Sequence, residues 1–248
     1  MRSNSIPPTA GTYSPEFFER HRAGARRSAE VIVPLILDLA PSSSVVDVGC
    51  GLATWLAVIR EHGIDDVLGL DGDYMDRTQL EITADRFRAV DLARPFRLER
   101  TFDLAISLEV AEHLPASCVR DFVGSLTALA RVVLFSAAIP FQGGENHLNE
   151  QWPEYWAALF AEHQYIAVDC LRRRLWRDER VEWWYAQNTI VYVKDTALPG
   201  YPLLERDRDS NERTPLALVH PRRYVEWVEW WRDHYDSVPE ARGSSWVV

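Results

Sequence analysis

An apolar segment that runs into two glycines constrains the fold of this chain more than any other feature. Residues 45–48 are typical of a short buried strand, Gly49 and Gly51 follow, and a helix is predicted from about residue 53. Glycines remove Cβ atoms where a ligand must approach the backbone, and a helix start offers unpaired N–H groups. The next apolar run ends at Asp71, whose carboxylate can accept hydrogen bonds from both hydroxyls of a ribose. This spacing predicts an adenosine-containing ligand at the crevice of a doubly wound sheet.

The residues around these glycines separate two classes of adenosine cofactor. A dinucleotide such as NAD requires a third glycine near its pyrophosphate, and here that position holds Ala53, followed by the bulky Trp55. Asp47, just before the glycines, would repel a pyrophosphate, whereas it could act on the ammonium group of a methionine moiety, directly or through water. The segment 46–51 resembles motif I of the class I S-adenosyl-L-methionine (SAM) methyltransferases. The resemblance favours SAM, with S-adenosyl-L-homocysteine as its product, over NAD.

Alternating strand and helix patterns follow the glycine segment. Short, continuous apolar runs are typical of parallel strands covered on both faces, and they predict strands near 44–48, 67–71, 86–90, 102–107, 131–137, 164–171 and 186–194. Helices are expected from about residue 15 and over 25–39, 53–62, 75–80, 117–130 and 153–162. No clear helical stripe separates the last two strands, which predicts a hairpin. The fold class is therefore α/β: a Rossmann-like, mostly parallel seven-stranded sheet with one antiparallel strand and helices on both faces, as in the methyltransferases that the chain resembles.

The chain divides into two predicted parts. Residues 1–195 form the methyltransferase domain with an N-terminal helical cap, and residues 196–248 form a C-terminal extension. A helix near 221–235 in this extension places aromatic side chains on one broad face: Tyr224, Trp227, Trp230, Trp231 and Tyr235. This face is expected to pack on the core or on a second subunit in a homodimer, and lining a substrate pocket is the alternative.

The resemblance also implies contacts to the cofactor at the ends of four strands. Asp71 is expected to bind the ribose, and Asp91 or Leu92 the adenine amino group, although an ordinary strand-end cap is the alternative interpretation of Asp91. The full implied set is Asp47, Gly49, Gly51, Asp71, Gly72, Asp91, Leu92, Leu108 and Glu109. The segment 107–110 is unlike the Asn/Asp-Pro-Pro-aromatic sequence of the methyltransferases that act on DNA bases and protein glutamine. Neither substrate class is expected.

Two segments after the fourth and fifth strands carry the candidates for acid–base chemistry. His113 lies in the first segment, and His147 lies in the second, a polar loop over 138–156. Because an imidazole titrates near neutral pH, we expect His147, and after it His113, to act as the general base. The alternative is that His147 and Asn149 cap the following helix and hold the loop shut.

The same loop resembles a subgroup of bacterial methyltransferases with a His-x-Asn-Glu-Gln-Trp-Pro signature, present here at 147–153. This resemblance implies small secondary metabolites or sugars as acceptors, with methylation on oxygen or nitrogen. The expected acceptor contacts are Asn149, Trp152 and Tyr155. The aromatic residues of 182–188 are expected to pack within the predicted hairpin, and lining the acceptor pocket is the alternative.

No metal site is predicted from the sequence. His147, Glu150 and Glu145 could be combined into one, but no fourth ligand of recognisable spacing accompanies them. The three cysteines are widely spaced and form no CxxC pair, so neither a zinc site nor a disulfide framework is indicated: Cys50, Cys118 and Cys170.

Charge and hydropathy limit the partners. The formal net charge of −10 and the pI near 5.2 disfavour nucleic acid as a substrate. No apolar run approaches the length of a membrane span and no signal peptide is recognisable, so no membrane association and a cytoplasmic location are expected. The predicted function is SAM-dependent methyl transfer to a small molecule. A non-catalytic SAM-binding interaction protein is the alternative, followed by an NAD(P)-dependent oxidoreductase.

Overall fold

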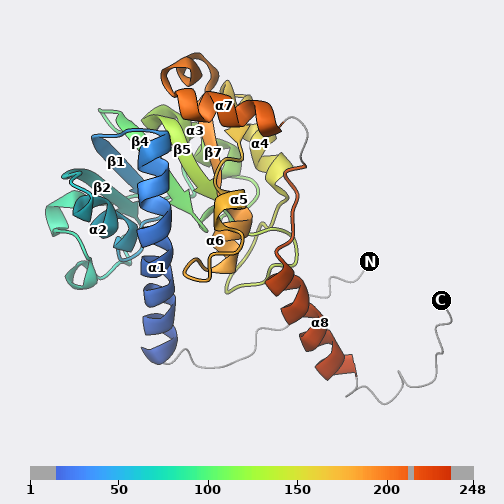
Figure 1. Ribbon diagram of the computed structural model, residues 1–248. Coiled ribbons are helices and arrows are strands. Elements are labelled where there is room, and N and C mark those ends of the chain that lie inside the picture. The colour runs from blue at the N-terminus through green and yellow to red at the C-terminus, as the bar shows by residue number, and fades with distance from the viewer. Residues whose placement is uncertain (1–14, 212–214, 236–248) are drawn as a thin grey trace.

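One mixed sheet organises the computed structural model, which describes residues 15–211 and 215–235 (Figure 1). Its strands are β1 (Ser44–Val48), β2 (Asp66–Asp71), β3 (Phe87–Ala89), β4 (Phe102–Leu108), β5 (Ala130–Ser136), β6 (Tyr165–Val168) and β7 (Ile190–Lys194). They lie in the order β3-β2-β1-β4-β5-β7-β6, and β7 runs antiparallel to both of its neighbours, whereas the pairs from β3 to β5 are parallel. The predicted seven-stranded sheet with one antiparallel strand is confirmed.

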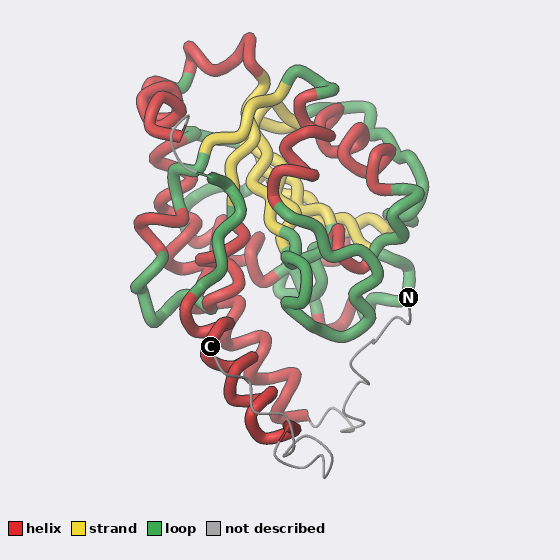
Figure 2. Tube along the Cα trace, turned by 90° about the vertical axis from the view of Figure 1, so that its right-hand side faces the viewer, coloured by secondary structure: helices red, strands yellow, loops and turns green. Residues whose placement is uncertain are grey.

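Helices cover both faces of this sheet, as predicted, and Figure 2 shows the strands enclosed between them. The helices are α1 (Pro15–Leu39), α2 (Thr54–Glu61), α3 (Val119–Leu129), α4 (Pro153–Ala161), α5 (Arg172–Leu175), α6 (Trp183–Asn188), α7 (Pro202–Asn211) and α8 (Pro221–Tyr235). Val45 and Leu104 pack with α1 and α2 on one face, and their neighbours Val46 and Ala105 pack with α3 and α4 on the other. Because side chains alternate along a strand, each continuous apolar run contributes to both cores.

Two predicted helical segments differ from the structure. The two helices expected at the N-terminal end are one continuous helix, α1, which passes through Gly24. Gly24 has no Cβ at the point where the carboxylate of Glu182 lies against the helix, so the contact forms without a break. The helix predicted over 75–80 is only a 3-10 turn, Arg77–Gln79, because the carboxylate of Asp76 accepts the N–H of Thr78 and begins a local turn.

The segment between the last two strands is also partly helical, contrary to the prediction. It contains α5 and α6, and α6 replaces the first half of the strand that was expected over 186–194. Both helices are only one or two turns long, which is too short for a 3.6-residue period to be visible in the sequence. The strands on either side of this segment pair antiparallel, as predicted for a hairpin, with Val168 opposite Val191. Further 3-10 turns occupy Ala84–Arg86, Ala111–His113 and Asp195–Gly200.

Within the predicted C-terminal extension, α7 packs on the core through Leu204, whereas α8 projects from the domain (Figure 1). Aromatic side chains of α8 are exposed: Tyr224 by 63%, Trp227 by 41% and Trp231 by 46%. These residues therefore do not pack on the core of this chain, and dimerisation through them stays a prediction. The side chain of Tyr235 lies outside the described residues, as do residues 1–14 of the predicted methyltransferase domain and residues 212–214 and 236–248 of the predicted extension. No described helix is long and apolar enough to cross a membrane.

The direction of the strands brings the expected site residues to one edge of the sheet. The carboxyl ends of β1, β2, β4 and β5 meet there because these strands are parallel. The antiparallel β7 begins at the same edge, and it is preceded by α6. Loops that follow the parallel strands and the short helix before β7 therefore surround a common space.

Candidate active site

The turn after β1 uses its two glycines differently. Gly49 has a φ of 83°, in the left-handed region, and its N–H donates to the carbonyl of Leu70 at 2.8 Å. A Cβ at this position would overlap the side chain of Val110, so the fold itself requires a glycine here. Gly51 has a φ of 52°, and a Cβ there would meet no atom within 4 Å. Gly51 therefore leaves open space beside the backbone.

The carboxylate of Asp71 joins the ends of β1 and β2. Its Oδ2 accepts the N–H of Gly51 at 2.8 Å, and its Oδ1 accepts the N–H of Gly72 at 2.7 Å and the hydroxyl of Tyr74 at 2.7 Å. Asp71 is 5% exposed, whereas Tyr74 is 79% exposed. The exposed phenol is therefore the partner that a ribose hydroxyl would replace if Asp71 binds the cofactor as predicted.

Asp47 places an unpaired carboxylate oxygen behind the same turn. The residue is 3% exposed, and its Oδ2 has no hydrogen-bond partner among the described residues. Burial raises the pKa of Asp47 well above its usual range, and the nearby charge of Asp71 adds to the effect. A buried carboxylate is stabilised by a cation or a hydrogen-bond donor. Together with the open space at Gly51, this oxygen fits a ligand that carries a cationic group, as the methionine part of SAM does.

The two residues predicted to contact adenine lie just beyond β3. Asp91 is exposed, its Oδ1 accepts the N–H of Ala93 at 3.0 Å, and its Oδ2 lies 3.3 Å from the guanidinium of Arg94. This geometry is that of the strand-end cap, the alternative interpretation of Asp91. Leu92 is half-buried against the core. The adenine contact stays a prediction for both residues.

Glu109 follows Leu108, the last residue of β4, and sits in a network of amide side chains. It has a φ of 54°, and its N–H donates to the carbonyl and the hydroxyl of Ser136, both at 3.0 Å. Its carboxylate accepts the amide of Gln142 at 3.0 Å and that of Asn188 at 3.1 Å. Burial raises the pKa of Glu109, and these donors offset only part of the effect. The network fixes this carboxylate at the edge of the sheet.

Sequence reasoning missed the amide residues of this network. Gln187 donates to Gln142 at 3.1 Å and to Asn188 at 2.9 Å, and all three side chains are buried. The sequence predicts Gln187 and Asn188 at the start of a strand, in a segment expected to pack, with pocket walls as the alternative. Gln187 and Asn188 are adjacent amides just before the antiparallel strand β7, at the sheet edge that carries the other site residues. This position is the signal that could have identified them.

A second carboxylate organises the loop that follows β5. Glu150 accepts the N–H groups of Phe141 at 2.7 Å and Gly143 at 2.8 Å, and it pairs with Nδ1 of His147 at 2.9 Å. Burial alone would raise the pKa of Glu150, but these donors outweigh it and lower the pKa. The helix α4 begins after Trp152 without a side-chain cap, so the predicted capping by His147 and Asn149 is wrong. The loop is instead closed around Glu150.

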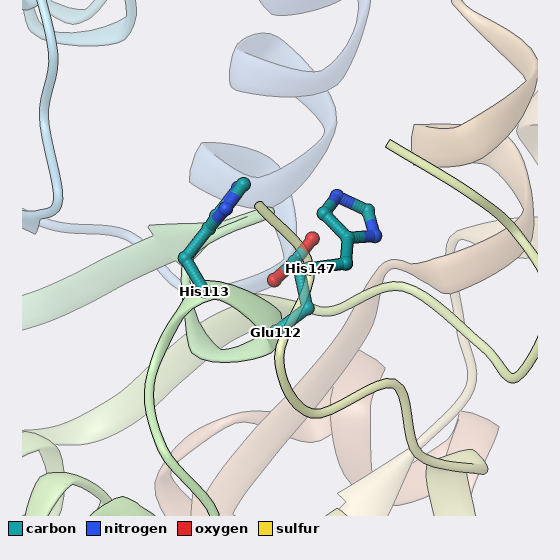
Figure 3. Close-up of side chains that lie close together, drawn as sticks. All are labelled: Glu112, His113 and His147. Atoms are coloured by element: carbon teal, nitrogen blue, oxygen red, sulfur yellow. The ribbon is translucent and has the colours of Figure 1, made fainter. Parts of the chain in front are cut away.

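This loop brings the two predicted catalytic histidines together. The ring centroids of His113 and His147 are 4.9 Å apart with the planes at 85°, and Figure 3 shows the carboxylate of Glu112 beside both rings. Glu112 is fully buried, and burial followed by the charge of Glu109 raises its pKa well above the usual range. The ring of His113 is exposed on one side, yet desolvation on the other side and the neighbouring His147 lower its pKa.

The three predicted acceptor contacts lie in different surroundings. Asn149 is 4% exposed, its N–H donates to the carbonyl of Glu112 at 2.9 Å, and its amide nitrogen has no partner among the described residues. Trp152 is 40% exposed, and Tyr155 packs edge-on against Trp156. In the described part of the chain, no hydrogen bond or ring contact joins Trp152 or Tyr155 to the histidines. Asn149 therefore fits the site best, and the roles of all three stay predictions.

Comparisons with known proteins agree with this geometry. A family model described as a methyltransferase domain matches residues 18–178, more than half of the chain. No protein with a curated functional description matches the chain.

Solved structures of methyltransferases share the fold at low sequence identity. A sugar N-methyltransferase from Streptoalloteichus sp. is 18% identical, with 78% of this chain and 98% of that one covered and a TM-score of 0.55. An amino pentose methyltransferase from Micromonospora echinaspora is 15% identical, with 74% and 98% covered and a TM-score of 0.54. An O-methyltransferase family protein from Burkholderia thailandensis is 15% identical over 72% of this chain, which spans only 59% of that protein, with a TM-score of 0.50. The chain belongs to the methyltransferase-domain family.

Proposed function

We propose that this enzyme methylates a hydroxyl or amino group of a small molecule. The observation that carries the proposal is the meeting of His113 and His147 beside Glu112, at the same sheet edge as Asp47 and Asp71. SAM, when bound, supplies an electrophilic methyl carbon. The residues of the chain then need to align the acceptor with that carbon and to remove a proton from it.

The hydrogen bond between His147 and Glu150 orients the imidazole for proton transfer. The donors around Glu150 lower the pKa of its carboxyl, so at neutral pH it is ionised and acts only as an acceptor. This hydrogen bond places a proton on Nδ1 of His147, so in the neutral imidazole the lone pair lies on Nε2. This tautomer suits His147 as the general base, with His113 beside it as the second candidate.

The acidic edge of the sheet favours a neutral or cationic acceptor over an anionic one. Asp47, Asp71, Glu109 and Glu112 all lie there, and within the described residues none of them forms a salt bridge with Lys or Arg. Amino sugars and other polar secondary metabolites have this character. The names of the similar structures, a sugar N-methyltransferase and an amino pentose methyltransferase, support the same acceptor class.

The test is turnover against a panel of hydroxylated and aminated sugars, measured as S-adenosylhomocysteine released. We expect His147→Ala to lower kcat roughly 10²-fold with cofactor affinity retained, because a positioned base contributes about 10²–10⁴. His62→Ala, at an exposed histidine after α2, is the matched control and should leave turnover unchanged. Unchanged turnover in both His147→Ala and His113→Ala would overturn the assignment. Cofactor binding without any turnover would favour the non-catalytic alternative.

A further inference from the structure

Three side chains lie close together at the edge where the carboxyl ends of the parallel strands meet. Proton transfer alone does not explain why a buried carboxylate lies beside the two imidazoles. One nitrogen of His113, one nitrogen of His147 and one carboxylate oxygen of Glu112 lie within 4.8 Å of one another (Figure 3). We propose that these three residues bind a first-row divalent transition metal ion, which in turn binds oxygen atoms of the acceptor. With the ion bound, the two imidazoles are its ligands in place of the general-base role proposed above, and the ion itself activates the bound hydroxyl. The role toward the acceptor rests on the proposed methyl transfer, whereas the binding of the ion does not. These ligands differ from the possible metal ligands named from the sequence, which were His147, Glu150 and Glu145.

Glu112 is the strongest indication of a missing cation. Its side chain is fully buried, its Oε1 accepts the N–H of Ala138 at 3.2 Å, and its Oε2 has no hydrogen-bond partner among the described residues. Buried carboxylates are paired with cations or coordinate metals. A divalent ion at Oε2 would stabilise the ionised form of this carboxyl.

The imidazole of His147 is held in the way that metal-binding histidines are held. Such a histidine almost always donates its other ring N–H to a carboxylate or a backbone carbonyl. His147 has this arrangement with Glu150 through Nδ1. Gly144 leaves the space that the ring of His147 occupies, since a Cβ there would overlap it. One nitrogen of His147 is thus anchored and the other is available to an ion.

The donor set indicates the class of ion. Two imidazole nitrogens and one carboxylate occur in catalytic zinc sites and in the facial triads that hold Fe(II), whereas Mg²⁺ and Ca²⁺ prefer oxygen ligands. Metal–ligand bonds of about 2.0–2.2 Å separate two ligands of a tetrahedral ion by roughly 3.4 Å. The atoms within 4.8 Å here need only small rotations to reach that separation, and the exposed ring of His113 can turn.

Three protein ligands leave coordination positions open at the sheet edge. A hydroxyl oxygen of the acceptor, or two neighbouring oxygens, can occupy them, because such an ion accepts oxygen ligands readily. The proposal therefore favours oxygen over nitrogen as the methylated atom. It also favours acceptors with adjacent hydroxyl or carbonyl groups.

The experiment is a titration of the EDTA-treated, dialysed full-length protein with Co²⁺, followed by visible absorption and calorimetry. We expect one Co²⁺ per chain and a visible band from nitrogen coordination. Glu112→Gln, His113→Ala and His147→Ala should each weaken binding at least 10-fold. Glu150→Gln, which replaces the carboxylate that His147, Phe141 and Gly143 share by an amide, should weaken it about 10–100-fold. His62→Ala is the control and should bind Co²⁺ as the wild type does.

The metal site would be overturned if the wild type did not bind Co²⁺. It would also be overturned if Glu112→Gln and His147→Ala bound Co²⁺ as strongly as the wild type. Circular dichroism melts show whether each variant is folded. If a histidine variant does not fold, the isosteric Glu112→Gln variant still tests Co²⁺ binding. Calorimetry with S-adenosylhomocysteine on the same protein separates the two proposals. Cofactor binding and turnover that persist without any Co²⁺ site would overturn the metal proposal alone. Co²⁺ binding without cofactor binding would overturn the proposed function alone.

Discussion

Replacing Gly49 by alanine should be costly for two separable reasons. Its φ of 83° is in the left-handed region, where alanine costs roughly 1–2 kcal/mol. The new Cβ would also overlap both methyl groups of Val110, and overpacking of a core costs about 1–3 kcal/mol. We therefore expect Gly49→Ala to lower the free energy of unfolding by roughly 2–5 kcal/mol, measured by urea denaturation.

Gly63 offers a matched control for the conformational part of this cost. Its φ is 87°, but a Cβ there would meet no atom within 4 Å, so Gly63→Ala should cost only roughly 1–2 kcal/mol. Val110→Ala in the Gly49→Ala background removes the methyl groups that the new Cβ would overlap. It should therefore recover about 1–3 kcal/mol of the free energy of unfolding lost to this overlap, and a double-mutant cycle measures this amount as the coupling between the two positions. Equal losses in the two glycine variants, or the absence of coupling to Val110, would refute the collision as the cause.

Three further predictions concern the charged and polar groups of the site. Burial raises the pKa of Asp47, so the folded state favours the protonated form of this carboxyl. The pKa of Asp47 in the unfolded chain is about 4. As the pH rises above this value, the wild type should lose stability relative to the Asp47→Asn variant. Urea denaturation across pH checks this, and a constant difference would contradict it. Tyr74→Phe removes the competitor of a ribose at Asp71 and should tighten SAM binding about two- to tenfold in calorimetry; weaker binding would mean that the phenol itself holds the cofactor. Asn188→Ala takes a donor from Glu109 and should lower the free energy of unfolding by about 1–3 kcal/mol, and a loss under about 0.5 kcal/mol would count against the network.

The sheet could be predicted from the sequence because its signal is local. Strands such as β1 and β4 are continuous apolar runs whose alternate residues serve two cores, and this pattern is visible within a few residues. The short helices α5 and α6 could not be predicted, because one or two turns carry no period. They are stabilised instead by distant contacts, such as the packing of Trp55 against Tyr185 at 5.2 Å between ring centroids.

In the candidate site, too, single residues could be predicted from the local sequence, whereas contacts between distant segments could not. His113 and His147 could each be identified, because each follows a strand that ends at the active edge. Their contact with each other could not, since it depends on the closure of a loop around Glu150 and on two hydrogen bonds from this loop to the carbonyl of Glu112. Glu112 is fully buried beneath this loop, and its burial could not be predicted for the same reason.

The charges at this edge favour the cofactor over its product. Asp47 and Glu112 each keep a buried oxygen without a hydrogen-bond partner in the described part of the chain, and Asp71 and Glu109 add two more carboxyl groups. Methyl transfer converts the sulfonium cation of SAM into a neutral thioether, so the product has one positive charge fewer to attract these groups. If the cofactor binds here as predicted, its cation favours the ionised form of Asp47, whose pKa burial raises, and the neutral product loses this interaction. This asymmetry requires no conformational change, because it follows from unpaired oxygens that the fold places at the edge of the sheet.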